Sequence, residues 1–280
     1  MNLAEAEDAT RRLRLDPTGA RLASASSRWI WHLPDAAAAL FVTRPGTKDR
    51  DSLSYELTAA AAARSVGVRT PALLAGPVQF GASFAFAVEW VDAVPFTSDA
   101  WPDVTRQLAL LADADATGIP PLTWHADWPR PEWRDVLGEG LAAALVDRCV
   151  SSNEDLARLL AGDLVLAHGD VQPANALLDR SGSTWLVDFE YARRTPREWD
   201  PAKLSILTRR FGDPADAAEL LPAWPPLDPN RLAACVAAQE TQIVAWLADM
   251  ALNGTDGAAS EARQRAAGLD DPSARWQHLR

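Results

Sequence analysis

The first ninety residues combine short runs typical of β-strands with one stretch of helical periodicity. The β-prone runs are bounded by Pro, Gly and Ser, which favours strands joined by tight turns. Leu53 and Leu57 recur at helical spacing, and the helix that they indicate ends near Val66. Either Asp51 or Ser52 can cap its start. We therefore predict one helix among strands over residues 28–33, 40–44 and 83–91.

From residue 99 onward, apolar residues recur with a period near that of an α-helix. An island of short strands interrupts these helices and is punctuated by Pro173 and by a Ser181-Gly182 turn. We predict helices over residues 99–117, 131–150, 153–161, 231–252 and 258–268, and strands over residues 165–167, 176–178 and 185–187.

This order of elements predicts an α+β protein with two lobes. A small β-rich N-terminal lobe with one helix would comprise residues 1–91, and a larger, mainly helical C-terminal lobe would comprise residues 92–280. The length agrees, because 280 residues exceed the usual size of a single hydrophobic core. A cleft forms at such a junction, and we expect the catalytic groups on the loops that face it.

The composition is that of a globular protein. Hydrophobic residues make up 48% of the chain and charged residues 23%, and no stretch reaches the roughly 20 apolar residues of a membrane helix. The N-terminal sequence has no secretory or transit signal, so we expect a cytoplasmic protein. The two cysteines, Cys149 and Cys235, exclude a disulfide scaffold and a cysteine-rich zinc site.

The net charge of −11 restricts the partners. It repels nucleic acid and anionic membranes, so we expect neither as a partner. It attracts cationic ligands, although the same charge also serves solubility alone. Acidic residues that continue through the C-terminal lobe favour a cationic small molecule bound there: Asp213, Asp216, Glu219, Asp228, Glu240 and Asp249.

The strongest chemical signal lies around the strand island, in the segment LVLAHGDVQPANALLDRSGSTWLVDFEYA. His168 and Asp170 come directly after the first of these strands, and Asn175 follows five positions after Asp170. A hairpin then leads to Asp188 at the end of an apolar strand. The hairpin is expected to bring the oxygen-bearing side chains of Asp170, Asn175 and Asp188 together.

These side chains fit phosphoryl transfer. That reaction needs a carboxylate that orients the attacking hydroxyl and accepts its proton, and it needs oxygen ligands for Mg²⁺. Asp170 fits the first role. Asn175 and Asp188 fit the second, because an amide oxygen and one carboxylate leave coordination positions for water and phosphate oxygens.

The sequences HGDVQPAN and LVDFE resemble the catalytic signature of the aminoglycoside phosphotransferase and choline kinase family, the small-molecule relatives of protein kinases. The resemblance covers nearly the whole chain. It implies a bilobal protein-kinase-like fold, ATP or GTP as phosphate donor, Mg²⁺ as cofactor and a hydroxylated small molecule as acceptor. It also implies that Asp170 is the catalytic residue, that Asn175 and Asp188 bind the metal, and that His168 and Asp200 support the loop.

The same resemblance implies nucleotide-binding residues in the N-terminal lobe. Arg44 at a strand end and Glu56 in the following helix resemble the ion pair that positions the α and β phosphates in kinases, with Lys48 as a substitute for Arg44. Ser26 stands where protein kinases have a glycine-rich loop. The segment from Glu89 to Val91 resembles the hinge whose backbone contacts the purine.

We therefore expect a small-molecule kinase, and two other functions fit part of the pattern. A catalytically silent nucleotide-binding protein of the same fold is favoured by the atypical Arg44 and by the lack of a glycine-rich loop in the sequence. A metal-dependent phosphoesterase would use the same acidic residues, but it needs several His or carboxylate ligands, and only His168 stands beside them. The acceptor, whether an antibiotic, an amino alcohol or a sugar, has no transferable sequence signature.

Overall fold

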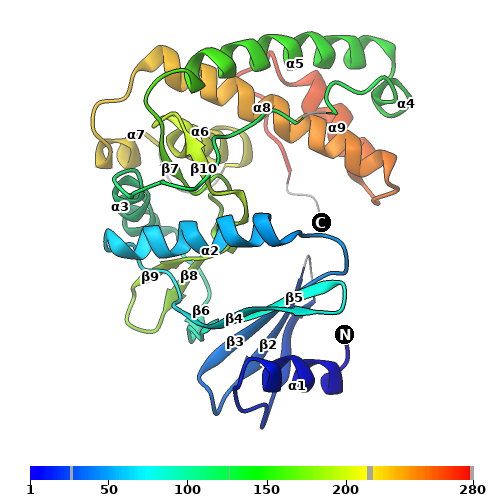
Figure 1. Cartoon of the computed structure of the whole chain (residues 1–280). Coiled ribbons are helices and arrows are strands. Elements are labelled where there is room, and N and C mark those ends of the chain that lie inside the picture. The colour runs from blue at the N-terminus through cyan, green and yellow to red at the C-terminus, as the bar shows by residue number, and fades with distance from the viewer. Residues whose placement is uncertain (26–27, 126, 213–216, 278–280) are drawn as a thin grey trace.

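The computed structural model describes residues 1–25, 28–125, 127–212 and 217–277. Strands dominate the N-terminal part and helices the C-terminal part, as predicted (Figure 1). In chain order, the elements are α1 (Leu3–Arg12), β1 (Arg21–Ala25), β2 (Arg28–Leu33), β3 (Ala38–Thr43), α2 (Arg50–Ser65), β4 (Leu73–Phe80), β5 (Ser83–Glu89), β6 (Ala93–Val94), α3 (Trp101–Leu111), α4 (Trp133–Leu137), α5 (Glu139–Leu160), β7 (Val165–Ala167), β8 (Ala176–Asp179), β9 (Thr184–Leu186), β10 (Arg193–Thr195), α6 (Trp199–Ile206), α7 (Ala217–Leu220), α8 (Pro229–Leu252) and α9 (Ala258–Ala267).

A five-stranded antiparallel sheet forms the N-terminal lobe, in the order β1-β2-β3-β5-β4. Leu40 and Val42 of the central strand β3 are buried on one face of the sheet, because side chains two positions apart share a face. Helix α1, which the sequence analysis did not predict, packs against this core. The three strands predicted in this lobe are present, but β3 ends at Thr43 and leaves Arg44 beyond it.

Helix α2 lies between the sheet and the C-terminal lobe (Figure 1). Its alanine-rich face belongs to the hydrophobic core of that lobe. The predicted cap at Asp51 or Ser52 is wrong, because the carboxylate of Asp49 accepts the N–H of Ser52 at 2.7 Å and makes Asp49 the N-cap. Glu56 is buried on this helix, and a buried carboxylate needs cationic or hydrogen-bonding partners.

The C-terminal lobe is built mainly of helices, with α5, α8 and α9 around one apolar core. Two small sheets lie beside them: β7 pairs with β10, and β8 lies between β6 and β9. The segments that follow β7 and β9 carry the predicted catalytic residues. Because β6 already pairs with β8, the chain enters the C-terminal lobe by residue 93, and the exact lobe boundary after residue 91 stays a prediction.

Two helical boundaries differ from the sequence prediction. Gly138, with a φ of 81°, divides the predicted helix over residues 131–150 into α4 and α5. Helix α5 then continues through Ser152 and Asn153, where we predicted a new helix start. The hydroxyl of Ser152 is buried 3.3 Å from that of Thr241 in α8. This contact between helices satisfies a side chain that otherwise favours a helix cap.

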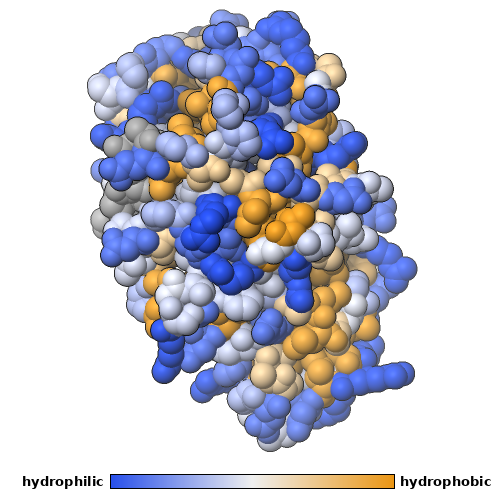
Figure 2. Space-filling view, turned by 90° about the vertical axis from the view of Figure 1, so that its left-hand side faces the viewer, coloured by the Kyte–Doolittle hydropathy of each residue, from blue (hydrophilic) through white to orange (hydrophobic). Residues whose placement is uncertain are grey.

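None of the helices in the described part of the chain is both long and apolar enough to span a membrane. The face shown in Figure 2 carries hydrophobic residues in separate patches among hydrophilic ones. The exposed large hydrophobic side chains are scattered over the chain, from Leu3 in α1 to Trp246 in α8.

Candidate active site

The predicted catalytic loop begins where β7 ends. Gly169 has a φ of 82°, and a Cβ atom at this position would come within 2.3 Å of the carbonyl oxygen of Tyr191. Glycine is therefore required both by the left-handed backbone and by the close approach of the segment after β9. This approach brings the loop that contains Asp170 next to the segment that contains Asp188.

Two buried side chains hold the loop. The carboxylate of Asp200, in the first turn of α6, accepts the backbone N–H of His168 at 2.8 Å and that of Gly169 at 3.0 Å. Burial raises the pKa of Asp200, although His168 and the two N–H groups favour its charged form. Nε2 of His168 lies 2.9 Å from the carbonyl oxygen of Val187, one residue before Asp188. His168 and Asp200 thus contact the backbone on both sides of the loop.

Three donors surround the carboxylate of Asp170. Its Oδ2 atom accepts hydrogen bonds from Gln172 Nε2 at 2.8 Å and from Asn175 Nδ2 at 2.9 Å. Its Oδ1 atom accepts one from Nζ of Lys203 at 3.3 Å, a cation on α6 that the sequence analysis did not single out. The side chain of Asp170 remains 24% exposed, so a bound hydroxyl group can reach this oriented carboxylate.

Asn175 and Asp188 are tied to the same loop. Nδ2 of Asn175 donates to the side chain and to the backbone oxygen of Asp170, both at 2.9 Å. The backbone oxygen of Asn175 accepts the N–H of Val187 at 3.0 Å, which holds the residue before Asp188 in place. Asp188 itself has a φ of 64° and a ψ of 66°. Residues other than glycine rarely adopt this left-handed conformation, and such outliers cluster at functional sites.

Arg28, the first residue of β2, contacts three carboxylates and was missed by the sequence analysis. Its Nη1 atom donates to Glu56 at 2.6 Å, and its Nη2 atom donates to Asp188 and to Glu190 at 2.9 Å each. The Arg28 side chain is only 6% exposed, so these carboxylates stabilise its charge in place of water. Burial raises the pKa of Asp188, and the charge of Arg28 opposes this rise.

The predicted ion pair between Arg44 and Glu56 is not formed in the described structure. In the described part of the chain, the cations that contact Glu56 are Arg28 and Lys48, the residue predicted as a substitute. The guanidinium carbon of Arg44 instead lies 4.1 Å from the centre of the Trp29 ring. Trp29 is on the neighbouring strand β2. The face of its ring attracts the positive charge of Arg44, which follows the last residue of β3.

Two of the other predicted nucleotide-binding residues, Glu89 and Val91, lie along the connection between the lobes. Glu89 ends β5, and its backbone N–H donates to the carbonyl oxygen of Ala72 at 2.9 Å, while its side chain is exposed. Val91 follows in the connection and is half-buried. Ser26 lies outside the described residues. The roles of these three residues therefore stay predictions.

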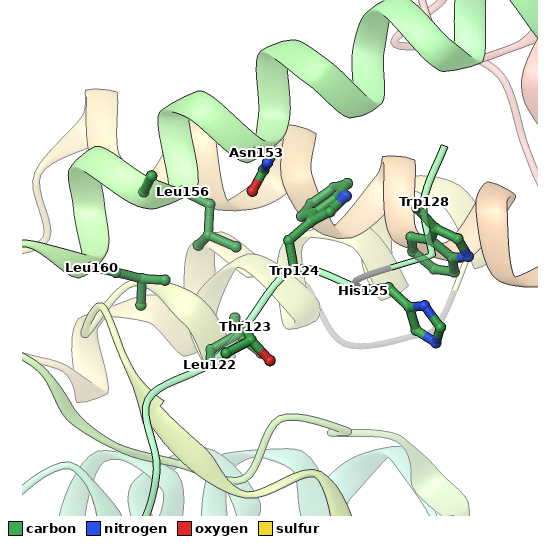
Figure 3. Close-up of a pocket in the computed structure, with 9 residues that line it drawn as sticks. Leu122, Thr123, Trp124, His125, Trp128, Asn153, Leu156 and Leu160 are labelled. Carbon is green, nitrogen blue, oxygen red and sulfur yellow. The ribbon is translucent and has the colours of Figure 1, made fainter. Parts of the chain in front are cut away.

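A cavity of about 370 Å³ lies in the C-terminal lobe, between α5 and the segment that precedes α4 (Figure 3). Trp124 and Trp128 line it from that segment, and Leu156 lines it from α5. Trp133, the first residue of α4 after this segment, is fully buried in the core. None of the predicted catalytic or metal-binding residues lines this cavity, so it is distinct from the candidate active site.

Residues 18–235 match the model of a family described as the phosphotransferase enzyme family. The matched span covers more than half of the chain and includes the complete loop from His168 to Asp188. The chain belongs to this family. Among curated proteins, no sequence matches the phosphotransferase.

Solved structures share the fold of the phosphotransferase. A microcompartment-associated aminopropanol kinase has a TM-score of 0.72 and 19% sequence identity, with 96% of this chain and 95% of that chain covered. Choline kinase LicA from Streptococcus pneumoniae has a TM-score of 0.66 and 15% identity, with 94% and 96% covered. A spectinomycin phosphotransferase in complex with ADP and spectinomycin has a TM-score of 0.58 and 14% identity, with 91% and 90% covered. The predicted bilobal kinase-like fold is confirmed by these structures, and the family identifies the chain as a phosphotransferase.

Asp200→Asn should destabilise the phosphotransferase and lower its turnover. The amide that replaces the carboxylate can accept only one of the two backbone N–H groups, and its own N–H₂ then faces the other. An unsatisfied buried donor costs about 1–3 kcal/mol, which urea unfolding should detect. Asp163→Asn, at an exposed position just before β7, is the matched control. Wild-type stability and turnover in Asp200→Asn would show that Asp200 does not hold the loop.

Proposed function

We propose that the phosphotransferase moves the γ-phosphate of ATP or GTP onto a hydroxyl group of a small molecule, with Asp170 as the catalytic residue. One observation carries this proposal: Gln172, Asn175 and Lys203 hold the carboxylate of Asp170 in one orientation, while part of it stays accessible. A carboxylate held in this way can accept a hydrogen bond from the acceptor hydroxyl and then take its proton.

The residues beside Asp170 fit Mg²⁺. The amide nitrogen of Asn175 donates hydrogen bonds to Asp170, so the amide oxygen of Asn175 is the atom left for a metal ion. The carboxylate of Asp188 would provide the second protein ligand. Charge also favours a cation here, because the cluster around Glu56 brings three carboxylates together with two basic side chains. When bound, Mg²⁺ would neutralise the negative charge of the phosphate oxygens.

The nucleotide would lie between the two lobes. We infer that its base contacts the backbone from Glu89 to Val91 and that its phosphates approach Lys48, which is 9% exposed and paired with Glu56 and Glu190. The ADP in the spectinomycin phosphotransferase supports a nucleoside triphosphate as donor. The choice between ATP and GTP and the cytoplasmic location expected from the sequence both stay predictions.

Three of the six acidic residues that suggested a cationic acceptor are engaged within the fold. Glu240 is buried against Arg210, and Asp249 accepts the indole N–H groups of Trp128 and Trp133. Asp228 caps α8, whereas Asp213 and Asp216 lie outside the described residues. The three engaged carboxylates are therefore not available to bind a cationic acceptor.

We nevertheless propose a hydroxylated amine as the acceptor, on other grounds. Solved structures of similar fold include an aminopropanol kinase and a choline kinase, and their named substrates carry both a hydroxyl group and a cationic nitrogen. The partly exposed carboxylates of Glu190 and Asp170 would suit the nitrogen and the hydroxyl, respectively.

A panel of acceptors tests this function. ATP and GTP, each with Mg²⁺, are incubated with amino alcohols, choline, spectinomycin and neutral sugars, and the phosphorylated product is detected by ³¹P NMR. We expect phosphate transfer that depends on a hydroxylated amine, with an apparent affinity that decreases as salt screens the charges over about 10 Å. Selective, salt-independent transfer to a neutral sugar would contradict the proposed acceptor.

The same panel separates the alternative functions. Release of inorganic phosphate without any acceptor would identify a phosphoesterase. Nucleotide binding without turnover on every acceptor would favour the catalytically silent protein.

A further inference from the structure

The phosphate-orienting cation of protein kinases is a lysine on the third strand of the N-terminal lobe, paired with a glutamate on the following helix. Here Glu56 on α2 supplies the glutamate, but β3 ends at Thr43, whose buried hydroxyl accepts the N–H of Phe84 at 2.9 Å. Arg44 follows and lies against Trp29. The cation beside Glu56 therefore has to come from another element.

Arg28 reaches that place from β2. Its Cα is paired in register with that of Thr43, so the two residues lie side by side at one end of the sheet. From this end Arg28 contacts Asp188. From there the side chain extends to Glu56, and it also reaches Asp188 and Glu190 in the C-terminal lobe. It thus occupies the position between the helix glutamate and the proposed metal ligand.

The guanidinium group retains donors for a ligand. Arginine has five N–H donors, and contacts within the described residues use three of those of Arg28. The donors that these contacts leave are Nε–H and one N–H of Nη1, and each can donate to a different phosphate oxygen. Its rigid, buried setting also means that little side-chain freedom would be lost when a phosphate binds.

We propose that Arg28 orients the α and β phosphates of the donor nucleotide from β2, together with Lys48, in the place of a lysine on β3. This inference rests on the proposed nucleotide-dependent function. Arg28 acts on the phosphates directly, so its effect does not require Mg²⁺. The nucleoside part of the donor, which carries no phosphate, lies outside its reach.

The test compares nucleotides with nucleosides. Dissociation constants of ADP, GDP, adenosine and guanosine are measured by calorimetry, with Mg²⁺ and with EDTA, for the wild-type protein, Arg28→Ala and Arg28→Lys. Arg21→Ala is the matched control, because Arg21 is an exposed arginine of the same sheet that bonds to His32. We expect Arg28→Ala to weaken binding of the diphosphate by roughly 10- to 100-fold, both with Mg²⁺ and with EDTA, and to leave nucleoside binding unchanged.

Arg28→Lys keeps a positive charge and serves as the test if Arg28→Ala does not fold. We expect it to keep the wild-type nucleoside affinity and to weaken diphosphate binding by a smaller factor, because an ammonium keeps the charge but has fewer donors than a guanidinium. An equal loss for nucleoside and diphosphate would show that Arg28 only braces the two lobes and would overturn the inference. Unchanged diphosphate binding would also overturn it. A wild-type protein that binds neither diphosphate would instead refute the proposed function.

Discussion

Asp170→Asn should lower turnover by roughly 10²- to 10⁴-fold, the usual effect of losing an acid or base group, while nucleotide affinity stays nearly unchanged. The carboxylate accepts hydrogen bonds from Gln172, Asn175 and Lys203 and makes no contact with Arg28 or Glu56 in the described structure. An asparagine can keep the two amide donors on its oxygen, but its nitrogen then faces Lys203. The loop is therefore retained, whereas the acceptor hydroxyl loses its proton acceptor.

Single-turnover kinetics with the best acceptor and calorimetric titration of ADP measure the two effects separately. Asp163→Asn, with the same chemical change at an exposed site near β7, should behave as the wild type in both. A melting temperature close to that of the wild type would confirm that the loss is chemical. Near wild-type turnover in Asp170→Asn would remove this residue from the mechanism.

The central part of the site could be predicted because it is local in sequence. His168, Asp170 and Asn175 lie within one loop, and a short hairpin connects it to Asp188. Spacing alone therefore limits how far apart these side chains can be. Gly169 lies in the same loop, and only glycine at this position allows the close approach of Tyr191.

The cations of the site could not be predicted in the same way. Arg28 is 160 positions from Asp188 in the sequence, and Lys203 is 33 positions from Asp170. No motif marks an arginine at the start of a β-prone run as a partner of a distant carboxylate. Arg44 looked more suitable because it follows β3 directly, but its side chain lies over the Trp29 ring and donates to the backbone oxygen of Ala25.

The fold shows a similar limit. Periodicity predicted most strands and long helices, since the burial of an apolar face decides both. It predicted a break near residue 151 where α5 is continuous, because the contact between Ser152 and Thr241 of α8 depends on how two helices pack. The same holds for the acidic residues of the C-terminal lobe, where Arg210 and the indole groups of Trp128 and Trp133 decide which carboxylates remain available.

Asp188→Ala should weaken nucleotide binding by roughly 10²-fold or more in the presence of Mg²⁺ and have little effect in EDTA. Even residues that only support a metal ligand typically contribute 10- to 100-fold to metal affinity, so loss of a ligand should cost at least as much. The variant is expected to fold, because Arg28 keeps its contacts with Glu56 and Glu190 when Asp188 is removed. Calorimetric titration of ADP with and without the metal measures the difference.

The dependence on metal distinguishes Asp188 from Arg28, although their side chains are only 2.9 Å apart. A residue that acts through Mg²⁺ loses its effect when the ion is removed, whereas a residue that contacts phosphate directly does not. Asp188→Ala also frees a donor of Arg28, which can then bind phosphate without competition from this carboxylate, so ADP affinity in EDTA should be unchanged or slightly higher. Equal weakening with and without Mg²⁺ would exclude Asp188 as a metal ligand and leave it with the structural task of neutralising Arg28.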